Sequence, residues 1–190
     1  MLRWFALAVF LASLSIAAWH GRRTREPIPR TRTLVVSPLF GAVLAYLANP
    51  AWMAWASLSL PLWIRWIGVA LGVAVIPSFH WVLATFGANR GETVGTKQQH
   101  RLVTTGPYRW LRHPMYMVGI ALAVSVGLMA ANWFILLWAM VVIVAVRLVV
   151  IPREEAKLVA MFGDEYRRYR SRTGSFLPFV PGKGARRTAG

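Results

Sequence analysis

The sequence predicts an all-α integral membrane protein with about five transmembrane helices. The 190 residues are 57% hydrophobic and include 10 Trp, and the apolar residues gather in long runs. About five runs of roughly 20 residues fill the chain, so no soluble domain of ordinary size fits beside them. Basic and uncharged segments alternate between the runs, as they do when successive loops lie on opposite sides of a membrane.

The first two helices are expected over residues 2–19 and 34–47, and residues 20–33 between them carry five Arg against a single Glu. Small residues near Ala18 also permit a cleaved signal peptide at the first run. Cleavage would leave the basic segment outside the membrane, whereas such segments favour the cytoplasm. We therefore expect the first helix to be retained.

Three more helices are expected over residues 60–83, 115–130 and 133–151. Asn132 marks a very tight turn between the last two helices, and Pro152 interrupts the helical pattern after them. The loop charges predict a multi-pass protein of a bacterial-type inner membrane, with the N-terminus outside and the C-terminus in the cytoplasm. The basic tail then forms a segment at the cytoplasmic membrane interface.

The residues that the sequence lacks exclude several kinds of site. It has no cysteine for a disulfide or a thiolate metal site, and its four His and six acidic residues show no metal-ligand spacing. It also lacks a G-x-G-x-x-G pattern, so no Rossmann domain is expected. The net charge of +16 lies beside membrane helices, which predicts contacts with membrane lipids and not with nucleic acid.

A first polar cluster precedes the fourth helix. Pro114 suits the first turn of a helix, where free backbone N–H groups can bind a carboxylate. Arg112 adds a guanidinium fork, and His113 and Tyr116 add hydrogen-bonding rings. A Gly-Pro pair upstream indicates a turn that lets the backbone approach a ligand. The same residues also fit a plain basic cap beside the membrane.

A second polar cluster follows the fifth helix and contains Glu154 and Glu155. Arg147 lies seven residues before Glu154, so a continuing helix would place both on one face. A charge at that depth needs a partner or water, although Arg147 could also extend to the interface. The acid pair could instead form salt bridges with Arg112 or Arg153. The tight hairpin of the last two helices should bring both clusters together at the cytoplasmic face.

Together the two clusters match a known pattern. Residues 100–116 read H-x-L-x-x-x-G-P-Y-x-x-x-R-H-P-x-Y, residues 154–169 read E-E-x-x-L-x-x-x-F-G-x-x-Y-x-x-Y, and residues 177–179 read L-P-F. Over about residues 98–180 the chain resembles the isoprenylcysteine carboxyl methyltransferase family, which is grouped with phospholipid N-methyltransferases. We therefore divide the chain into N-terminal membrane helices (1–97), a catalytic region (98–180) and a disordered basic tail (181–190).

The resemblance implies an enzyme that transfers a methyl group from S-adenosylmethionine to a lipophilic, membrane-embedded acceptor, either a small molecule or a lipid-modified substrate. The cofactor site that it implies consists of His100, Gly106, Pro107, Tyr108, Arg112, His113, Tyr116 and Glu154. The catalytic residues that it implies are Arg147, Arg153 and Glu155. One of the arginines would orient an acceptor carboxylate, whereas an amine would need an acid or histidine to take its proton.

Several alternatives remain open at the level of the sequence. The acceptor could be a phospholipid amine or a small thiol. A rival class is the NADPH-dependent membrane sterol or enone reductases, some of which have a similar C-terminal hairpin, and another is a non-catalytic membrane scaffold. Gly68 and Gly72 form a G-x-x-x-G pattern, which serves either a homodimer contact or packing within the chain.

Overall fold

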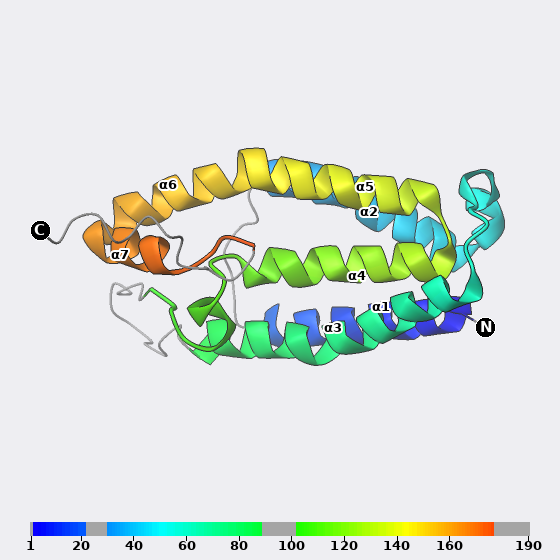
Figure 1. Cartoon of the computed structure of the whole chain (residues 1–190), viewed down its shortest axis with the longest axis horizontal. Helices are drawn as coiled ribbons and strands as arrows, with labels where there is room; N and C mark the ends of the chain where they lie inside the picture. The colour runs from blue at the N-terminus through cyan, green and yellow to red at the C-terminus, as the bar shows by residue number, and fades with distance from the viewer. Residues whose placement is uncertain (1, 22–29, 89–101, 177–190) are drawn as a thin grey trace, which may run out of the picture.

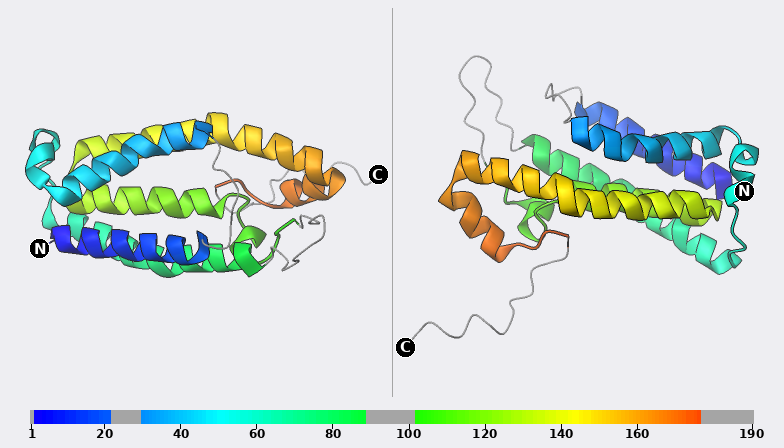
Figure 2. Two further views of the ribbon diagram at one scale, coloured as in Figure 1. Left: turned by 180° about the vertical axis from the view of Figure 1, so that it is seen from behind. Right: turned by 90° about the horizontal axis from the view of Figure 1, so that it is seen from above.

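The computed structural model describes residues 2–21, 30–88 and 102–176. The helices are α1 (Leu2–Gly21), α2 (Arg30–Ala48), α3 (Leu62–Ala88), α4 (Pro114–Ala130), α5 (Trp133–Ala145), α6 (Ile151–Phe162) and α7 (Asp164–Arg172). Two 3-10 turns, η1 (Pro50–Ala56) and η2 (Gly106–Arg109), and a π-helical turn, η3 (Val146–Val150), complete the regular structure. Figure 1 shows α1 to α5 side by side along the long axis, with α6 and α7 extending past one end. The view from above in Figure 2 shows the same extension.

The prediction of an all-α membrane protein is confirmed. Three helical stretches are long and apolar enough to cross a membrane, namely Leu2–His20, Leu62–Gly87 and Trp133–Phe162. The helix Val36–Ala48 and the turn after it, bent by 119°, make a fourth if they are counted as one span, and α4 is shorter at 17 residues. The five expected apolar helices therefore all form, while three or four of them qualify as full spans by length and composition.

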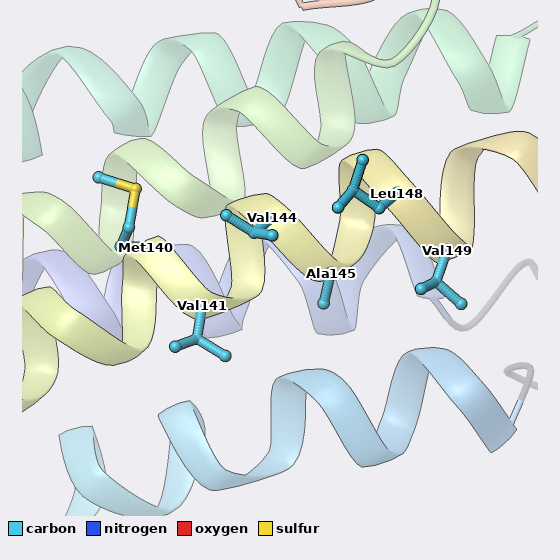
Figure 3. A pocket seen from close by; sticks show the side chains of 6 residues that line it. All are labelled: Met140, Val141, Val144, Ala145, Leu148 and Val149. Carbon is cyan, nitrogen blue, oxygen red and sulfur yellow. The ribbon is translucent and has the colours of Figure 1, made fainter.

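The outer surface of the bundle is apolar. Leu148 is 68% exposed and Trp63 is 64% exposed. A shallow hollow on the outer face of α5 and η3 is lined by Met140, Val141, Val144, Ala145, Leu148 and Val149 (Figure 3). No polar side chain contributes to this hollow, so it suits lipid chains and offers no chemistry. The chain is thus a multi-pass integral membrane protein.

Arginines close two helix ends at the end of the bundle opposite α7. Arg3 donates hydrogen bonds to the carbonyl oxygens of Leu47 (2.6 Å) and Ala48 (2.7 Å) at the C-terminus of α2. Arg65 donates to the carbonyl oxygen of Met129 (2.8 Å) near the C-terminus of α4. The last carbonyls of a helix lack partners and carry partial negative charge, so a guanidinium satisfies and neutralises them together.

The predicted tight turn at Asn132 is confirmed. Asn132 is 2% exposed, and its Oδ1 accepts a hydrogen bond from the backbone N–H of Ile135 (3.1 Å), which caps the start of α5. Its Nδ2 donates to the carbonyl oxygen of Met53 (3.2 Å), and Ala131 before it takes a left-handed φ of 50°. One side chain therefore caps α5 and ties η1 to the turn.

The G-x-x-x-G pattern on α3 packs within the chain. A Cβ added to Gly68 would lie 2.9 Å from both the Cβ of Leu128 and the carbonyl oxygen of Ser125 on α4. A Cβ added to Gly72 would lie 3.2 Å from Val9 on α1. Because α4 and α1 cover this face, the motif serves packing of neighbouring helices and not a dimer contact.

The fifth helix continues past Pro152, and the expectation that this proline interrupts it is wrong. In η3 the N–H of Ile151 bonds to the carbonyl oxygen of Val146, five residues earlier. A π-helical turn is wider than an α-helical turn, which leaves room for the proline ring and makes its missing N–H harmless. The helix then runs to Phe162 and carries the acid pair beyond the end of the bundle.

We expect Gly68→Ala to destabilise the protein by about 1–3 kcal/mol, because the new methyl group meets backbone and Cβ atoms that cannot rotate away. Gly41→Ala on α2 is the matched control, since nothing lies within 4 Å of a Cβ at Gly41. It should leave stability unchanged or raise it by up to about 1 kcal/mol. The measurement is the midpoint of thermal unfolding in detergent, followed by tryptophan fluorescence. Equal midpoints for the two variants would contradict the close contact between α3 and α4.

Candidate active site

The turn η2, before α4, is held against the C-terminal end of α3. Gly106 has a φ of +56°, and a Cβ at this position would lie 2.6 Å from the Oγ1 of Thr85. A side chain other than hydrogen would be strained and would clash, so glycine is required. The ring of Trp110 packs edge-on against Trp81 of α3 at 5.7 Å. The close backbone approach expected from the Gly-Pro pair is thus made to α3.

The start of α4 is paired with the segment that follows α7. Pro114 is the first residue of the helix, as predicted, and His113 before it is only 6% exposed. The backbone N–H of Arg112 donates to the carbonyl oxygen of Gly174 (2.8 Å), and that of His113 donates to Ser175 (3.4 Å). These two N–H groups therefore bind the chain's own C-terminal segment.

Glu155 lies at the centre of the polar cluster and is 7% exposed. Its Oε1 accepts a hydrogen bond from Arg112 Nε at 2.8 Å and lies 3.4 Å from His113 Nε2. Its Oε2 lies 3.3 Å from Arg170 Nε. A buried carboxylate needs such partners to offset the loss of water. These contacts join the start of α4, α6 and α7 around one charge.

Glu154 lies beside the other ring nitrogen of His113, on the side away from Glu155. The hydroxyl of Tyr116 donates to its Oε1 at 2.6 Å, and its Oε2 lies 3.8 Å from His113 Nδ1. The side chain of Glu154 is 31% exposed. His113 thus separates a buried carboxylate from one that solvent or a ligand can reach.

Two further contacts fix α7 over η2 and the start of α4. Arg112 donates through its terminal nitrogen to the carbonyl oxygens of Arg170 (3.0 Å) and Thr173. The hydroxyl of Tyr169 donates to the carbonyl oxygen of Tyr108 at 2.6 Å. The guanidinium of Arg112 is thus bonded to protein groups, which gives it a structural part in the cluster.

Burial sets the protonation of the cluster. It lowers the pKa of His113, against the opposing effect of the two carboxylates, so the ring is neutral at pH 7 and carries one N–H. Burial, helped by the charge of Glu155, raises the pKa of Tyr166 to about 12. Burial also raises the pKa of Tyr169. Both phenols therefore keep their protons at neutral pH, and that of Tyr169 donates a hydrogen bond.

The structure brings most of the predicted site residues together. Those in the cluster and in the turn beside it are Gly106, Pro107, Tyr108, Arg112, His113, Tyr116, Glu154 and Glu155. His100 and the L-P-F motif lie outside the described residues. Arg147 and Arg153 are exposed and make no polar contact with the cluster within the described ranges. Arg147 lies within the π-helical turn η3, so the α-helical spacing that would place it on one face with Glu154 does not apply.

The sequence motif contains Tyr166 and Tyr169, but sequence reasoning left α7 out of the predicted site. In the structure Tyr166, Tyr169 and Arg170 of α7, and Thr173 just after it, face the cluster after a reversal of the chain at Gly163, whose φ is +54°. Their spacing of three, four and seven residues from Tyr166 is that of one helix face and is the signal that could have added Arg170 and Thr173.

The family described as phospholipid methyltransferase matches residues 60–165, which is more than half of the chain. The chain belongs to this family. The match begins before α3, so the family region includes the helix that holds η2 as well as the two polar clusters. A probable protein-S-isoprenylcysteine O-methyltransferase of Oryza sativa is 30% identical over 189 residues, which cover 92% of this chain and 93% of that protein. The chain is accordingly a membrane methyltransferase that resembles the isoprenylcysteine enzymes.

Other proteins to which the chain is similar differ from it in length and in name. A protein-S-isoprenylcysteine O-methyltransferase of Schizosaccharomyces pombe is 34% identical over 84 residues, 44% of this chain but 36% of that protein. Methanethiol S-methyltransferase 1 of Bradyrhizobium diazoefficiens is 28% identical to this chain. The match covers 91% of this chain and 65% of that protein. A solved eukaryotic intramembrane Ras methyltransferase, an isoprenylcysteine carboxyl methyltransferase, shares the fold with a TM-score of 0.53. That match has 20% identity and covers 94% of this chain and 69% of the other.

Titration of His113 should make stability fall in acid. Because the pKa of His113 is lowered in the folded protein, the unfolded chain takes up the proton first as the pH falls. The contribution is complete above about pH 6.5, the pKa in the unfolded chain, and is lost below it. We expect the unfolding midpoint to fall more steeply between pH 7 and pH 5 for the wild type than for His113→Gln. Equal slopes would mean that folding leaves the pKa of His113 unchanged.

Proposed function

We propose that the chain transfers a methyl group from S-adenosylmethionine to a lipophilic acceptor at the end of the bundle where α6 and α7 extend beyond it. The observation that carries this proposal is the gathering of Glu154, Glu155, His113 and Arg112 at that end, within a methyltransferase family. A water-soluble cofactor and a lipid-soluble acceptor can meet only where a polar site borders an apolar surface.

The residues of the cluster fit the chemistry of this cofactor. Its amino-acid end carries an ammonium and a carboxylate, and Glu154 presents a partly exposed carboxylate suited to the ammonium. Tyr116 and His113 hold Glu154 in place, and the turn η2 would form the adjoining wall, with His100 added by resemblance. When bound, the cofactor supplies an electrophilic methyl group on a sulfonium sulfur.

The first candidate acceptor is a carboxylate of the isoprenylcysteine type, as the names of the rice and fission yeast relatives suggest. A carboxylate is already a nucleophile and needs orientation, which the exposed Arg147 or Arg153 would provide. Glu155 has both oxygens in ion pairs, so we assign it the task of positioning Arg112 and His113. If the acceptor is a phospholipid amine, an acidic residue or a histidine would have to take its proton.

A small thiol is the second candidate acceptor. It is supported by the likeness to a methanethiol methyltransferase over 91% of this chain. A small thiol needs no long apolar groove and no cationic partner. The acceptor's size therefore separates the two candidates.

We also propose that the cluster lies on the cytoplasmic side. The helices α1 and α3 end, and α2 begins, at the end of the bundle that carries α7 (Figure 1), and in the sequence α1 and α3 are each followed by several basic residues. The segments at the opposite end, residues 49–61 and 131–132, contain no charge. Such an asymmetry orients a membrane protein with its basic loops in the cytoplasm.

Calorimetry on the detergent-purified chain tests the cofactor. We expect S-adenosylmethionine to bind and Glu154→Gln to weaken binding about tenfold, as loss of one charge-assisted contact does. Arg167→Gln, on an exposed pair with Asp164, is the control and should bind like the wild type. Binding of NADPH in place of S-adenosylmethionine would overturn the proposal in favour of a reductase.

Transfer of a radiolabelled methyl group in lipid nanodiscs tests the acceptor. A farnesylated cysteine derivative, an aminophospholipid and a small alkyl thiol are offered in parallel. We expect the farnesylated carboxylate to be labelled, and Arg147→Gln or Arg153→Gln to raise its KM. If only the thiol is labelled, and neither substitution changes its labelling, the acceptor is a small thiol and the carboxylate proposal is wrong.

A further inference from the structure

The long helix that runs through α5, η3 and α6 has one buried face along its whole length. Its buried residues include a series that recurs every three to five positions, namely Ile135, Ala139, Val142, Val146, Val150 and Glu155. The buried face therefore persists through the π-helical turn and ends in the central acid of the polar cluster. The opposite face of this helix is exposed over the same length.

The exposed face begins with apolar side chains and ends with basic ones. The shallow hollow on α5 and η3 lies on this face, and its six apolar side chains follow one another along the helix toward α6 (Figure 3). Arg153 lies four residues after Val149, and Lys157 lies four residues after Arg153. All three side chains are exposed, and this spacing keeps them close to one line along the helix. The two basic side chains therefore come directly after the apolar hollow.

The length of the apolar part places the two basic residues at the edge of a membrane. From Trp133 to Pro152 the helix has about 20 residues, and Arg147 is the charged one among them. A helix of this length rises about 30 Å, which is the thickness of the hydrocarbon core of a bilayer. The hollow therefore lies among the acyl chains, and Arg153 and Lys157 lie where the lipid headgroups begin.

The charges on α6 favour an anion at this level. The two acids of α6 lie off the exposed face, because Glu155 is buried and Glu154 accepts a hydrogen bond from the hydroxyl of Tyr116 at 2.6 Å. Arg153 and Lys157 are the charged side chains that the exposed face of α6 presents. A basic pair just beyond an apolar surface suits a molecule with a negative headgroup and an apolar chain.

We propose that this face binds an anionic phospholipid of the surrounding bilayer, whose acyl chain lies in the hollow and whose phosphate pairs with Arg153 and Lys157. The site is on the side of the helix opposite Glu155 and is separate from the polar cluster, so the inference does not rest on the proposed function. Of the two arginines considered for the methyl acceptor, it assigns Arg153 to the lipid and favours Arg147 for the acceptor. The bound lipid would hold the first turn of α6 at the level of the headgroups.

Native mass spectrometry of the chain in detergent, titrated with phosphatidylglycerol or with phosphatidylcholine, tests this site. We expect the wild type to prefer phosphatidylglycerol. The double variant Arg153→Gln/Lys157→Gln should bind this lipid about 25-fold more weakly, because each basic residue near an anionic lipid contributes about a factor of five. Lys157→Gln alone, which has no part in the proposed methyl transfer, should cost about fivefold. Binding of phosphatidylcholine and the unfolding midpoint without lipid should stay unchanged, since both side chains are exposed.

Arg168→Gln/Arg172→Gln is the matched control, because it removes two exposed arginines that are also four residues apart, on α7. It should bind phosphatidylglycerol like the wild type. An equal loss of affinity in this control would mean that overall charge attracts the lipid, and would overturn the inference, as would equal affinities of the wild type for the two lipids. Displacement of phosphatidylglycerol by glycerol 3-phosphate would show that no acyl chain is needed, and would also overturn it. Displacement by the farnesylated cysteine derivative would instead make this face the site of the methyl acceptor.

Discussion

Glu155 places a buried negative charge at the end of an apolar bundle that carries α7, and the arrangement of that end follows from the need to compensate this charge. Its partners Arg112, His113 and Arg170 come from the start of α4 and from α7, while Glu155 itself is on α6. Holding one carboxylate therefore fixes three segments against one another. The same geometry directs the adjacent Glu154 to the other side of His113, where it stays partly exposed. Thus one acid organises the site and leaves its neighbour accessible.

The two ends of the bundle separate stability from chemistry. At the end of the bundle opposite α7, Arg3 and Arg65 bond to helix carbonyls and Asn132 caps α5. These polar side chains therefore serve to satisfy the helix termini. At the end that carries α7, the side chains of Glu154 and Arg170 remain partly exposed. Helix caps at one end of the bundle thus stabilise the fold, while polar groups at the other end stay accessible to a ligand, at some expense of stability.

The sequence predicts the helices well because a backbone in lipid must bond to itself over long apolar runs. The place of Pro114 and the meeting of the two clusters also follow from local rules and from the short turn at Asn132. The pairing of Glu155 with Arg170 does not, because it depends on the reversal of the chain at Gly163, a tertiary feature. Local rules for proline likewise gave the wrong outcome at Pro152, because they assume an α-helical turn and not a π-helical one.

The π-helical turn in η3 also constrains how the length of this chain can vary. Such a turn holds one residue more than an α-helical turn, and each residue of an α-helix rotates the rest of the helix by about 100°. Deleting a single residue between Val146 and Val150 would therefore turn η3 into an α-helical turn and leave the acid pair on nearly the same face of the helix. A single deletion within α5 or at the start of α6 would instead rotate the acid pair by about 100°, away from α4. Single-residue changes of length that keep the protein working should therefore be found in η3, or in the uncharged connection of residues 49–61, and not in the α-helical turns on either side of η3.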